Sequence, residues 1–179
     1  MPRYVAFLRA VNVGGRVVKM ETLRTLFGRM GFTNVQTVIA SGNVVFESPQ
    51  RSVRRIEETV EQGLKAALGY NVITFIRTMP ELTTLVEHPL VSDDALDAGA
   101  VLYVAFLREK PSPDAARKLT ALKSDAEDFH VHDRHVLWLV RGRFSNSSLS
   151  GPSLERTLGL PATIRNATTV RKIAQKFGS

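Results

Sequence analysis

The sequence predicts an α+β protein built from two tandem ferredoxin-like (βαββαβ) units with antiparallel sheets, plus a C-terminal helix. Three observations support this fold class. Short apolar runs alternate with amphipathic segments of helical period. The composition, 44% hydrophobic and 23% charged, is that of a globular protein. Residues 4–9 and 103–108 both read Tyr-Val-Ala-Phe-Leu-Arg, and each copy opens the same predicted order of elements, which indicates an internal duplication.

The first unit is predicted over residues 1–78. Apolar runs bounded by charged or turn residues place its strands at 3–9, 35–40, 43–47 and 72–76. Apolar side chains at helical spacing place its helices at 20–30 and 53–68. We expect Ser41 and Gly42 to form the hairpin turn between the second and third strands, because both residue types favour turns.

The second unit is predicted over residues 100–179. A connecting segment precedes it at 79–99, where Pro80, Pro89 and an acidic stretch at 93–97 interrupt the pattern around a short helix at 81–87. The strands of this unit are expected at 103–108, 127–132, 135–141 and 162–165. Its helices are expected at 115–122, 153–159 and 169–177, the last being the C-terminal helix.

The residues of each strand also predict its place in the sheet. In this topology the first and third strands are central, and here they should read as continuous apolar runs. Residues 4–8 and 136–140 are such runs, whereas residues 127–132 are polar enough for an edge strand. Because both faces of the central strands should be covered, we do not expect the sheets to bind RNA as an open RNA-recognition motif does.

The composition disfavours several classes of protein. No apolar run approaches the roughly 20 residues of a membrane-spanning helix, and residues 4–8 are too few for the apolar region of a signal peptide. The chain has no cysteine, which excludes disulfides, thiolate metal sites and cysteine nucleophiles. We therefore expect a cytoplasmic protein with no membrane partner and no cofactor.

Charge is distributed unevenly along the chain. Residues 1–78 hold 11 Lys/Arg and 5 Asp/Glu, residues 79–133 hold 5 and 11, and residues 134–179 hold 8 and 1. Two basic blocks thus flank an acidic one, and the net charge is +7. A fold that brings the basic blocks together would make one positive face suited to anionic partners, although a merely soluble basic surface explains the same pattern.

The first candidate cluster lies in and around the loop after the first predicted strand. It comprises Arg9, Asn12, Gly14, Gly15 and Lys19. Glycines leave backbone N–H groups free to face an anion, and the N-terminus of a helix follows. The spacing is not that of the P-loop G-x-x-x-x-G-K-[ST]. A tight turn before a helix remains the alternative interpretation.

The second candidate cluster lies at the start of the predicted C-terminal helix. It comprises Thr163, Arg165, Asn166, Thr168, Thr169 and Lys172. Arginine and lysine near the positive end of a helix suit a phosphate or carboxylate ligand. Asn166 or Thr168 also suits the N-cap position, which explains either residue without a ligand.

Three histidines form a third cluster, with a different interpretation. If Asp133 and Arg134 form a two-residue turn, His130, His132 and His135 share one face of the sheet and could bind zinc. An edge strand with polar side chains facing water gives the same pattern, and we predict no metal site. No G-x-S-x-G, H-E-x-x-H or dinucleotide-binding motif is present, so no catalytic motif is recognised.

Several motifs resemble the bacterial domain-of-unknown-function 1697 family. The resemblance rests on residues 7–15, 19–20 and 41–46, and then on 148–149, 158–159, 162–166, 169–170 and 172. Ala167 and Thr168 depart from it, because the family pattern has Trp and Asn there; if the Trp shapes a pocket, this chain has altered it. The resemblance implies a tandem ferredoxin-like fold and carries no assigned activity. It favours the first two clusters over the histidines, which lie outside the family motifs.

From these clusters we predict a binding module for a phosphate-bearing anion, either a nucleotide or a nucleic acid. The expected ligand-binding residues are Arg9, Asn12, Gly14, Gly15, Lys19, Ser41, Asn43, Arg165, Asn166, Thr169 and Lys172. An enzyme acting on a small anionic substrate is the first alternative, and a scaffold or dimerisation protein without a ligand is the second. A homodimer is compatible with each of these functions.

Overall fold

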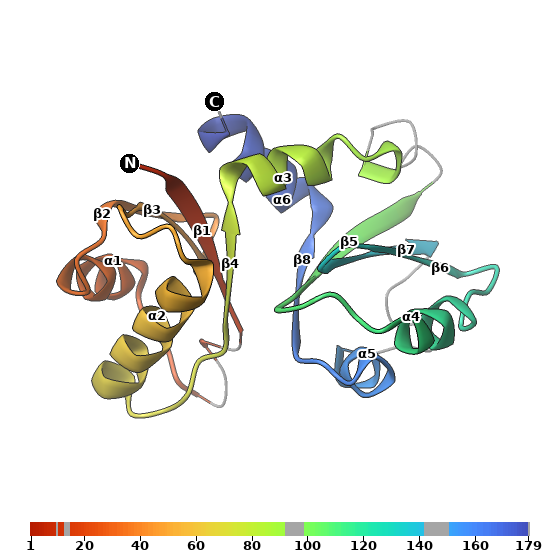
Figure 1. Ribbon diagram of the computed structural model, residues 1–179, viewed down its shortest axis with the longest axis horizontal. Coiled ribbons are helices and arrows are strands. Elements are labelled where there is room, and N and C mark those ends of the chain that lie inside the picture. Colours follow the sequence, from red (N-terminus) through yellow and green to blue (C-terminus); the bar gives the residue numbers. More distant parts are fainter. Residues whose placement is uncertain (10, 13–14, 92–98, 142–150, 179) are drawn as a thin grey trace. The chain divides into compact units, whose positions relative to one another are not determined.

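The computed structural model describes residues 1–9, 11–12, 15–91, 99–141 and 151–178 (Figure 1). The chain divides into two compact units, unit 1 over Met1–Leu82 and unit 2 over Thr83–Phe177. Among the described residues, no helix is long and apolar enough to cross a membrane. Gly14, the acidic stretch at 93–97 and the pair at 148–149 lie outside the described residues.

Unit 1 has the predicted order of elements. They are β1 (Arg3–Leu8), α1 (Met20–Arg29), β2 (Thr33–Val38), β3 (Ala40–Glu47), α2 (Val53–Leu68) and β4 (Thr74–Thr78); α3 (Met79–Val86) follows and spans the boundary between the units. The sheet, which we call sheet A, is antiparallel with the order β2-β3-β1-β4. The first and third strands are therefore central, which confirms the ferredoxin-like topology. The fourth strand spans Thr74–Thr78 rather than 72–76, because Val72 packs into the core before the strand begins.

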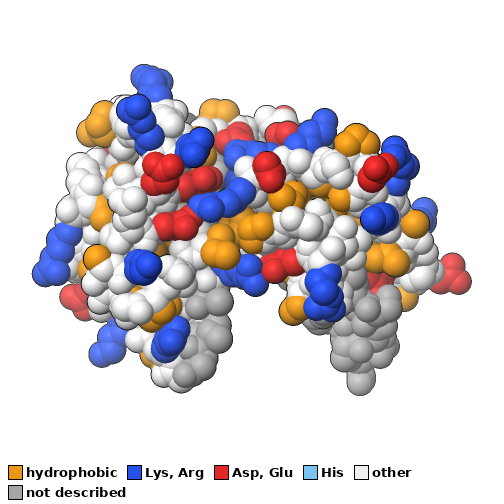
Figure 2. Space-filling view, turned by 60° about the horizontal axis from the view of Figure 1, so that its bottom comes forward, with side chains coloured by type: hydrophobic (Ala, Val, Ile, Leu, Met, Phe, Trp, Pro, Cys, Tyr) orange, Lys and Arg blue, Asp and Glu red, His pale blue; other side chains and the backbone are white. Residues whose placement is uncertain are grey.

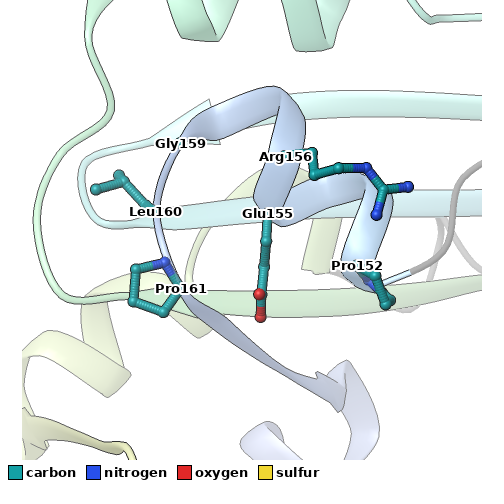
Figure 3. Close-up of a pocket in the computed structure, with 6 residues that line it drawn as sticks. All are labelled: Pro152, Glu155, Arg156, Gly159, Leu160 and Pro161. Atoms are coloured by element: carbon teal, nitrogen blue, oxygen red, sulfur yellow. The ribbon is translucent and has the colours of Figure 1, made fainter.

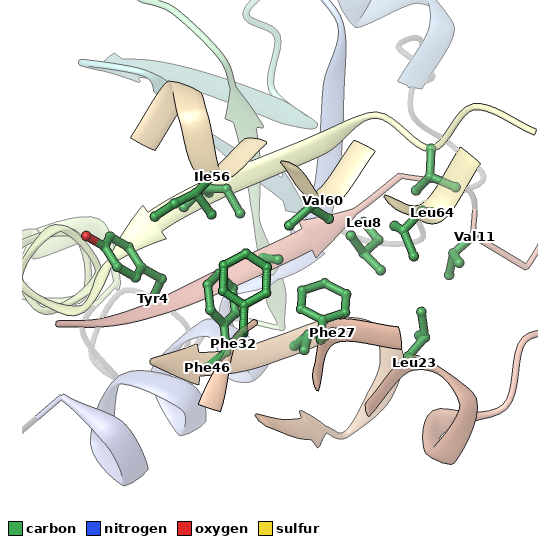
Figure 4. Close-up of a cluster of buried hydrophobic side chains, with 14 of the residues drawn as sticks. Tyr4, Leu8, Val11, Leu23, Phe27, Phe32, Phe46, Ile56, Val60 and Leu64 are labelled. Carbon is green, nitrogen blue, oxygen red and sulfur yellow. The ribbon is translucent and has the colours of Figure 1, made fainter. Parts of the chain in front are cut away.

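Helices α1 and α2 cover one face of sheet A (Figure 1). Alternate side chains of β1 point to this face, and Tyr4 and Leu8 are both buried in the core there. Phe46 of β3 lies among aromatic rings (Figure 4). Its ring centroid is 5.8 Å from that of Tyr4, 5.6 Å from that of Phe27 and 4.5 Å from that of Phe32. These spacings are those of favourable aromatic pairs, so Phe46 connects the sheet to α1 through direct packing.

The hairpin of unit 1 differs from the prediction. Ser41 and Gly42 lie within β3, and the chain reverses at Ile39, since Val38 pairs with Ala40. Ile39 takes a φ of +69°, a strained conformation for a β-branched residue. The prediction of a Ser-Gly turn was therefore wrong: β3 already begins at Ala40, which pairs with Val38 of β2, so the reversal is complete before Ser41.

Unit 2 has the same order of strands and helices. A 3-10 turn (Pro89–Val91) precedes β5 (Ala100–Leu107), α4 (Pro113–Thr120), β6 (Glu127–His132), β7 (His135–Arg141), α5 (Gly151–Leu158), β8 (Ala162–Asn166) and α6 (Ala167–Phe177). Its antiparallel sheet, sheet B, has the order β6-β7-β5-β8, which confirms β6 as an edge strand. Helices α4 and α5 cover one face of sheet B, and α6 packs on β5 and β8 (Figure 1).

The core of unit 2 contains a buried polar pair. Trp138 is fully buried, and its indole Nε1 donates a hydrogen bond of 3.0 Å to Oε2 of Glu127 on the adjacent strand. Glu127 itself is only 2% exposed. A buried indole N–H without a partner costs free energy, so this carboxylate has a structural role in the sheet.

The two units correspond beyond the repeated hexapeptide. Arg77 of β4 pairs in register with Val5, and Arg165 of β8 pairs with Val104, at the same position of each sheet. Each arginine donates from Nη1 to the carbonyl of the isoleucine before it, over 2.9 Å for Arg77 and 3.0 Å for Arg165. Each fourth strand also leads directly into a helix, β4 into α3 and β8 into α6. The segment predicted as a connector thus begins with a helix that corresponds to α6 in the order of elements.

Local capping explains why α3 begins directly after β4. The hydroxyl of Thr78 accepts from the Glu81 backbone N–H over 3.2 Å, and the carboxylate of Glu81 accepts from the Thr78 N–H over 3.1 Å. This reciprocal pair is a capping box, which satisfies two of the backbone donors that a helix start leaves open. Pro80 falls in the first turn, where proline is tolerated.

We predict that Phe46→Ala lowers the free energy of unfolding by about 3–5 kcal/mol, the usual cost of removing a fully buried phenylalanine. The measurement is urea denaturation followed by far-UV circular dichroism. Val17→Ala is the control, since Val17 is 79% exposed and its truncation should change the free energy by less than about 0.5 kcal/mol. Equal effects of the two substitutions would contradict the packing described for Phe46.

Candidate functional site

Three strand ends of sheet A meet beside the glycine loop of unit 1. Phe7, near the end of β1, pairs with Asn43 near the start of β3. The backbone N–H of Arg9 donates to the carbonyl of Ile73, just before β4, over 2.9 Å. The loop that follows Arg9 leads to the N-terminus of α1. The structure thus places the described residues of the first cluster, all but Gly14, in the loop at one end of sheet A.

Two side chains hold the backbone of this loop at Val11 and Val18, which are among its described residues. Oδ1 of Asn12 accepts a hydrogen bond of 2.6 Å from the Val18 backbone N–H. The hydroxyl of Tyr70 donates to the carbonyl of Val11 over 2.8 Å. Gly15 takes a φ of +80°, a conformation that favours glycine. Asn12 therefore has a structural role in the described part of the loop.

Three cationic residues flank or belong to this loop. The guanidinium carbon of Arg16 lies 4.2 Å from the centroid of the Tyr70 ring, a cation–π contact. Lys19 is the N-cap residue of α1, makes no side-chain cap hydrogen bond and is exposed. Arg9 is partly exposed. We call these three cations, together with Asn12 and Gly15, the basic loop. Arg16 and Tyr70 were not among the residues predicted from the sequence. The position of Arg16 between Gly15 and Lys19 does indicate that it belongs to the same loop.

Ser41 and Asn43 lie at the same end of sheet A but contribute differently from the basic loop. Asn43 is only 2% exposed, and its Nδ2 donates to the carbonyl of Val38 over 3.1 Å. Its amide therefore ties the end of β2 to β3. Ser41 lies within β3.

The second cluster lies in unit 2, where β8 passes into α6. Nη1 of Arg165 donates to Oγ1 of Thr163 over 2.7 Å and to the carbonyl of Ile164 over 3.0 Å. Burial lowers the pKa of Arg165 to about 10, so the guanidinium keeps its charge at neutral pH. Unit 2 therefore holds a charged arginine, largely removed from water, at the end of β8.

At the start of α6 the structure contains an N-cap, which was the alternative to a ligand site in the second cluster. Oδ1 of Asn166 accepts from the Thr168 backbone N–H over 2.8 Å, which makes Asn166 the N-cap residue. Thr169 is half-buried and Lys172 is exposed one turn later on α6. Ala167, which stands where the family pattern has Trp, is 1% exposed and packs into the protein. A small side chain occupies this buried position here.

Two surface hollows of the described residues are lined by residues outside the second cluster. A shallow hollow of about 450 Å³ lies beside α5 and is lined by Pro152, Glu155, Arg156, Gly159, Leu160 and Pro161 (Figure 3). Glu155 accepts a hydrogen bond from the Ala162 N–H over 3.2 Å, and Arg156 donates one to the Ser153 hydroxyl over 3.1 Å. Both charged groups therefore take part in local hydrogen bonds. A second hollow of about 340 Å³ lies along α1 and includes Lys19 and Arg29 in its lining.

Charge on the visible surface is mixed. In Figure 2, Lys and Arg side chains are interspersed with Asp, Glu and hydrophobic side chains. This face is therefore not uniformly positive, and the features that favour anion binding are the local basic clusters.

The histidines separate into two environments. Asp133 and Arg134 form the predicted turn, with a φ of +53° at Asp133, and His132 pairs with His135. His135 is buried, with its ring centroid 5.4 Å from that of Phe106. His130 and His132 instead lie beside His88, which sequence reasoning missed because it stands far away in the chain. Within the part of the chain that the structure describes, no group of three or more His, Cys, Asp or Glu is arranged to hold a metal ion.

Comparison with known proteins identifies a family and a fold. A solved structure of a conserved bacterial protein from Streptococcus pneumoniae is similar, with a TM-score of 0.72 and 22% identity over 97% of each chain; at this identity the likeness shows the fold alone. No curated protein matches. The model of the family described as "Protein of unknown function (DUF1697)" matches residues 1–137, which include the basic loop and end before the second cluster. The chain therefore belongs to the DUF1697 family.

Proposed function

We propose that the chain binds a phosphate-bearing anion, a nucleotide or a nucleic acid, and that the basic loop of unit 1 is the principal contact. One observation carries this proposal: Arg9, Arg16 and Lys19 flank or belong to a loop in which Asn12 accepts from the Val18 N–H, while Tyr70 donates to the Val11 carbonyl and contacts Arg16. A fixed loop loses little conformational entropy when a ligand binds, so more of the electrostatic attraction appears as affinity.

The position of the loop also favours an anion. The basic loop precedes α1, a helix of 10 residues whose first backbone N–H groups carry partial positive charge. The Lys19 side chain makes no cap hydrogen bond with this helix start. Arginine and lysine together with backbone N–H groups are the usual contacts of phosphate oxygens.

The second cluster is proposed as a further contact for the same class of ligand. Arg165 carries a largely buried positive charge, and Lys172 is exposed on α6 one turn beyond Thr169. Asn166 caps α6 through its oxygen, so its contribution is to position the helix start. The clusters are in different units, and each can be tested by its own substitutions.

We also infer that the two units arose by duplication. The repeated hexapeptide, the common order of elements and the matching positions of Arg77 and Arg165 support this inference. Binding residues need not be duplicated with the fold, because function depends on individual sites.

We predict that labelled single-stranded RNA, single-stranded DNA or duplex DNA binds with an affinity that falls steeply with salt, as counterion release requires. In fluorescence polarisation, Arg16→Ala with Lys19→Ala should weaken binding and reduce the salt slope by about 1 for each phosphate that is no longer neutralised. The matched control is Arg54→Ala with Lys65→Ala, which removes the same charge from exposed positions on α2 of the same unit.

Four outcomes of this experiment separate the explanations. A selective decrease in the affinity of the loop variant supports the proposal, whereas an equal decrease in the control indicates that only net charge matters. Unchanged binding in the loop variant indicates that the contact lies elsewhere, and Lys172→Ala then tests the second cluster. No binding of any nucleic acid or labelled nucleotide at low salt contradicts the proposed ligand class.

We predict that Asn12→Ala loosens the loop, because the Val18 N–H is deprived of its acceptor. Hydrogen exchange of the Val18 amide should become about five- to tenfold faster, which corresponds to the loss of about 1 kcal/mol of hydrogen-bond stability. Asn12→Asp is the matched control, since its carboxylate retains an acceptor oxygen for Val18. If exchange accelerates equally in both variants, the side-chain oxygen does not fix the loop.

A further inference from the structure

We propose that His88, His130 and His132 form a proton-sensitive latch that fastens the segment Thr83–Val91 to the edge strand of sheet B and releases it on acidification. This inference is independent of the anion-binding proposal, because it concerns other residues. All three histidines belong to unit 2. We call them the histidine latch.

The three imidazole rings are in contact. The ring centroid of His88 lies 4.9 Å from that of His130 and 5.4 Å from that of His132. His130 and His132 are separated by one residue on β6, so they project from the same face of the sheet. His88 follows α3 and precedes the turn Pro89–Val91. The latch thus joins an edge strand to a segment that is distant in sequence.

A hydrogen bond makes the protonation state of His88 structurally important. Its Nδ1 accepts a bond of 3.1 Å from the Leu90 backbone N–H. A neutral imidazole can accept at one nitrogen, whereas in an imidazolium both nitrogens are donors. Protonation of His88 therefore breaks this bond and also places a positive charge between two further imidazoles. Both effects weaken the latch.

The direction of the pH dependence follows from the environment of His88. Burial, and then the charges of His130 and His132, hold the pKa of His88 below its ordinary value of 6.5. Because the folded state binds this proton less readily than the unfolded state, the contribution of the latch is complete above about pH 6.5 and falls as the pH drops below it.

The other ionisable groups nearby have separate roles. His135 on β7 pairs with His132 in register but lies buried against Phe106. Asp128 on β6 forms an ion pair of 3.7 Å with Lys123. Glu87, next to His88, and Asp133, in the β6–β7 turn, are exposed. Among these groups Glu87 is the nearest along the chain to His88, so it is the control residue for the test.

Hydrogen exchange and histidine NMR test the latch on the full chain. With four histidines in the chain, each imidazole can be assigned by substitution. We expect the His88 resonance to titrate below pH 6.5, as its lowered pKa requires. The protection factor of the Leu90 amide should fall about tenfold between about pH 7 and pH 5, the decrease expected for one hydrogen bond and its packing. The amide of Leu137, buried in β7, serves as the reference for global unfolding.

Two variants distinguish the latch from other pH effects. His88→Asn removes the titrating group but keeps a side-chain oxygen that can accept from the backbone two residues on, so Leu90 should stay protected at both pH values. Glu87→Gln should behave like the unmodified protein. The proposal is overturned if protection of Leu90 does not change with pH, if protection falls equally in His88→Asn, or if Leu137 becomes less protected in parallel.

Discussion

The structure depends on the removal of both faces of β1 from water. Residues 4–8 are all at most 2% exposed, so no backbone group of this strand can rely on solvent for a hydrogen-bond partner. It must pair on both edges, with β3 on one side and β4 on the other. That double pairing fixes where three strand ends meet, and hence where the loop after Arg9 lies. The geometry of the basic loop is thus a consequence of how the core is buried.

The same burial explains which features of the fold could be predicted from the sequence. Continuous apolar runs identified the central strands, and the polar run at 127–132 identified β6 as an edge strand. The position of the hairpin turn could not be predicted, because the local preference of Ser41 and Gly42 is overruled by the pairing of β2 with β3, which extends to Val38 and Ala40. The short helix predicted at 81–87 is α3, and it begins earlier, at Met79, because Thr78 and Glu81 form a capping box.

The residues of the candidate sites also differ in whether they could be predicted from the sequence. Arg9, Asn12 and Lys19 could be proposed from sequence because loop residues next to glycine stay close together whatever the rest of the chain does. Tyr70 could not, since only folding brings it to Val11 and Arg16. Glu127 resembles a surface carboxylate in the sequence, and only its partner on the adjacent strand, Trp138, accounts for its burial. Contacts across strands are determined by register, which a single sequence specifies poorly at individual positions.

The buried Trp138 has a practical consequence for studying how the units unfold. It is the single tryptophan of the chain and lies in the core of unit 2, with its indole bonded to Glu127. Intrinsic fluorescence excited at the indole band therefore reports on unit 2, while the helices and strands of both units contribute to circular dichroism. A mismatch between the two unfolding curves would reveal units that melt separately, and coincident curves would reveal a single cooperative transition. Trp138 is thus an intrinsic fluorescence probe of whether the two units unfold cooperatively.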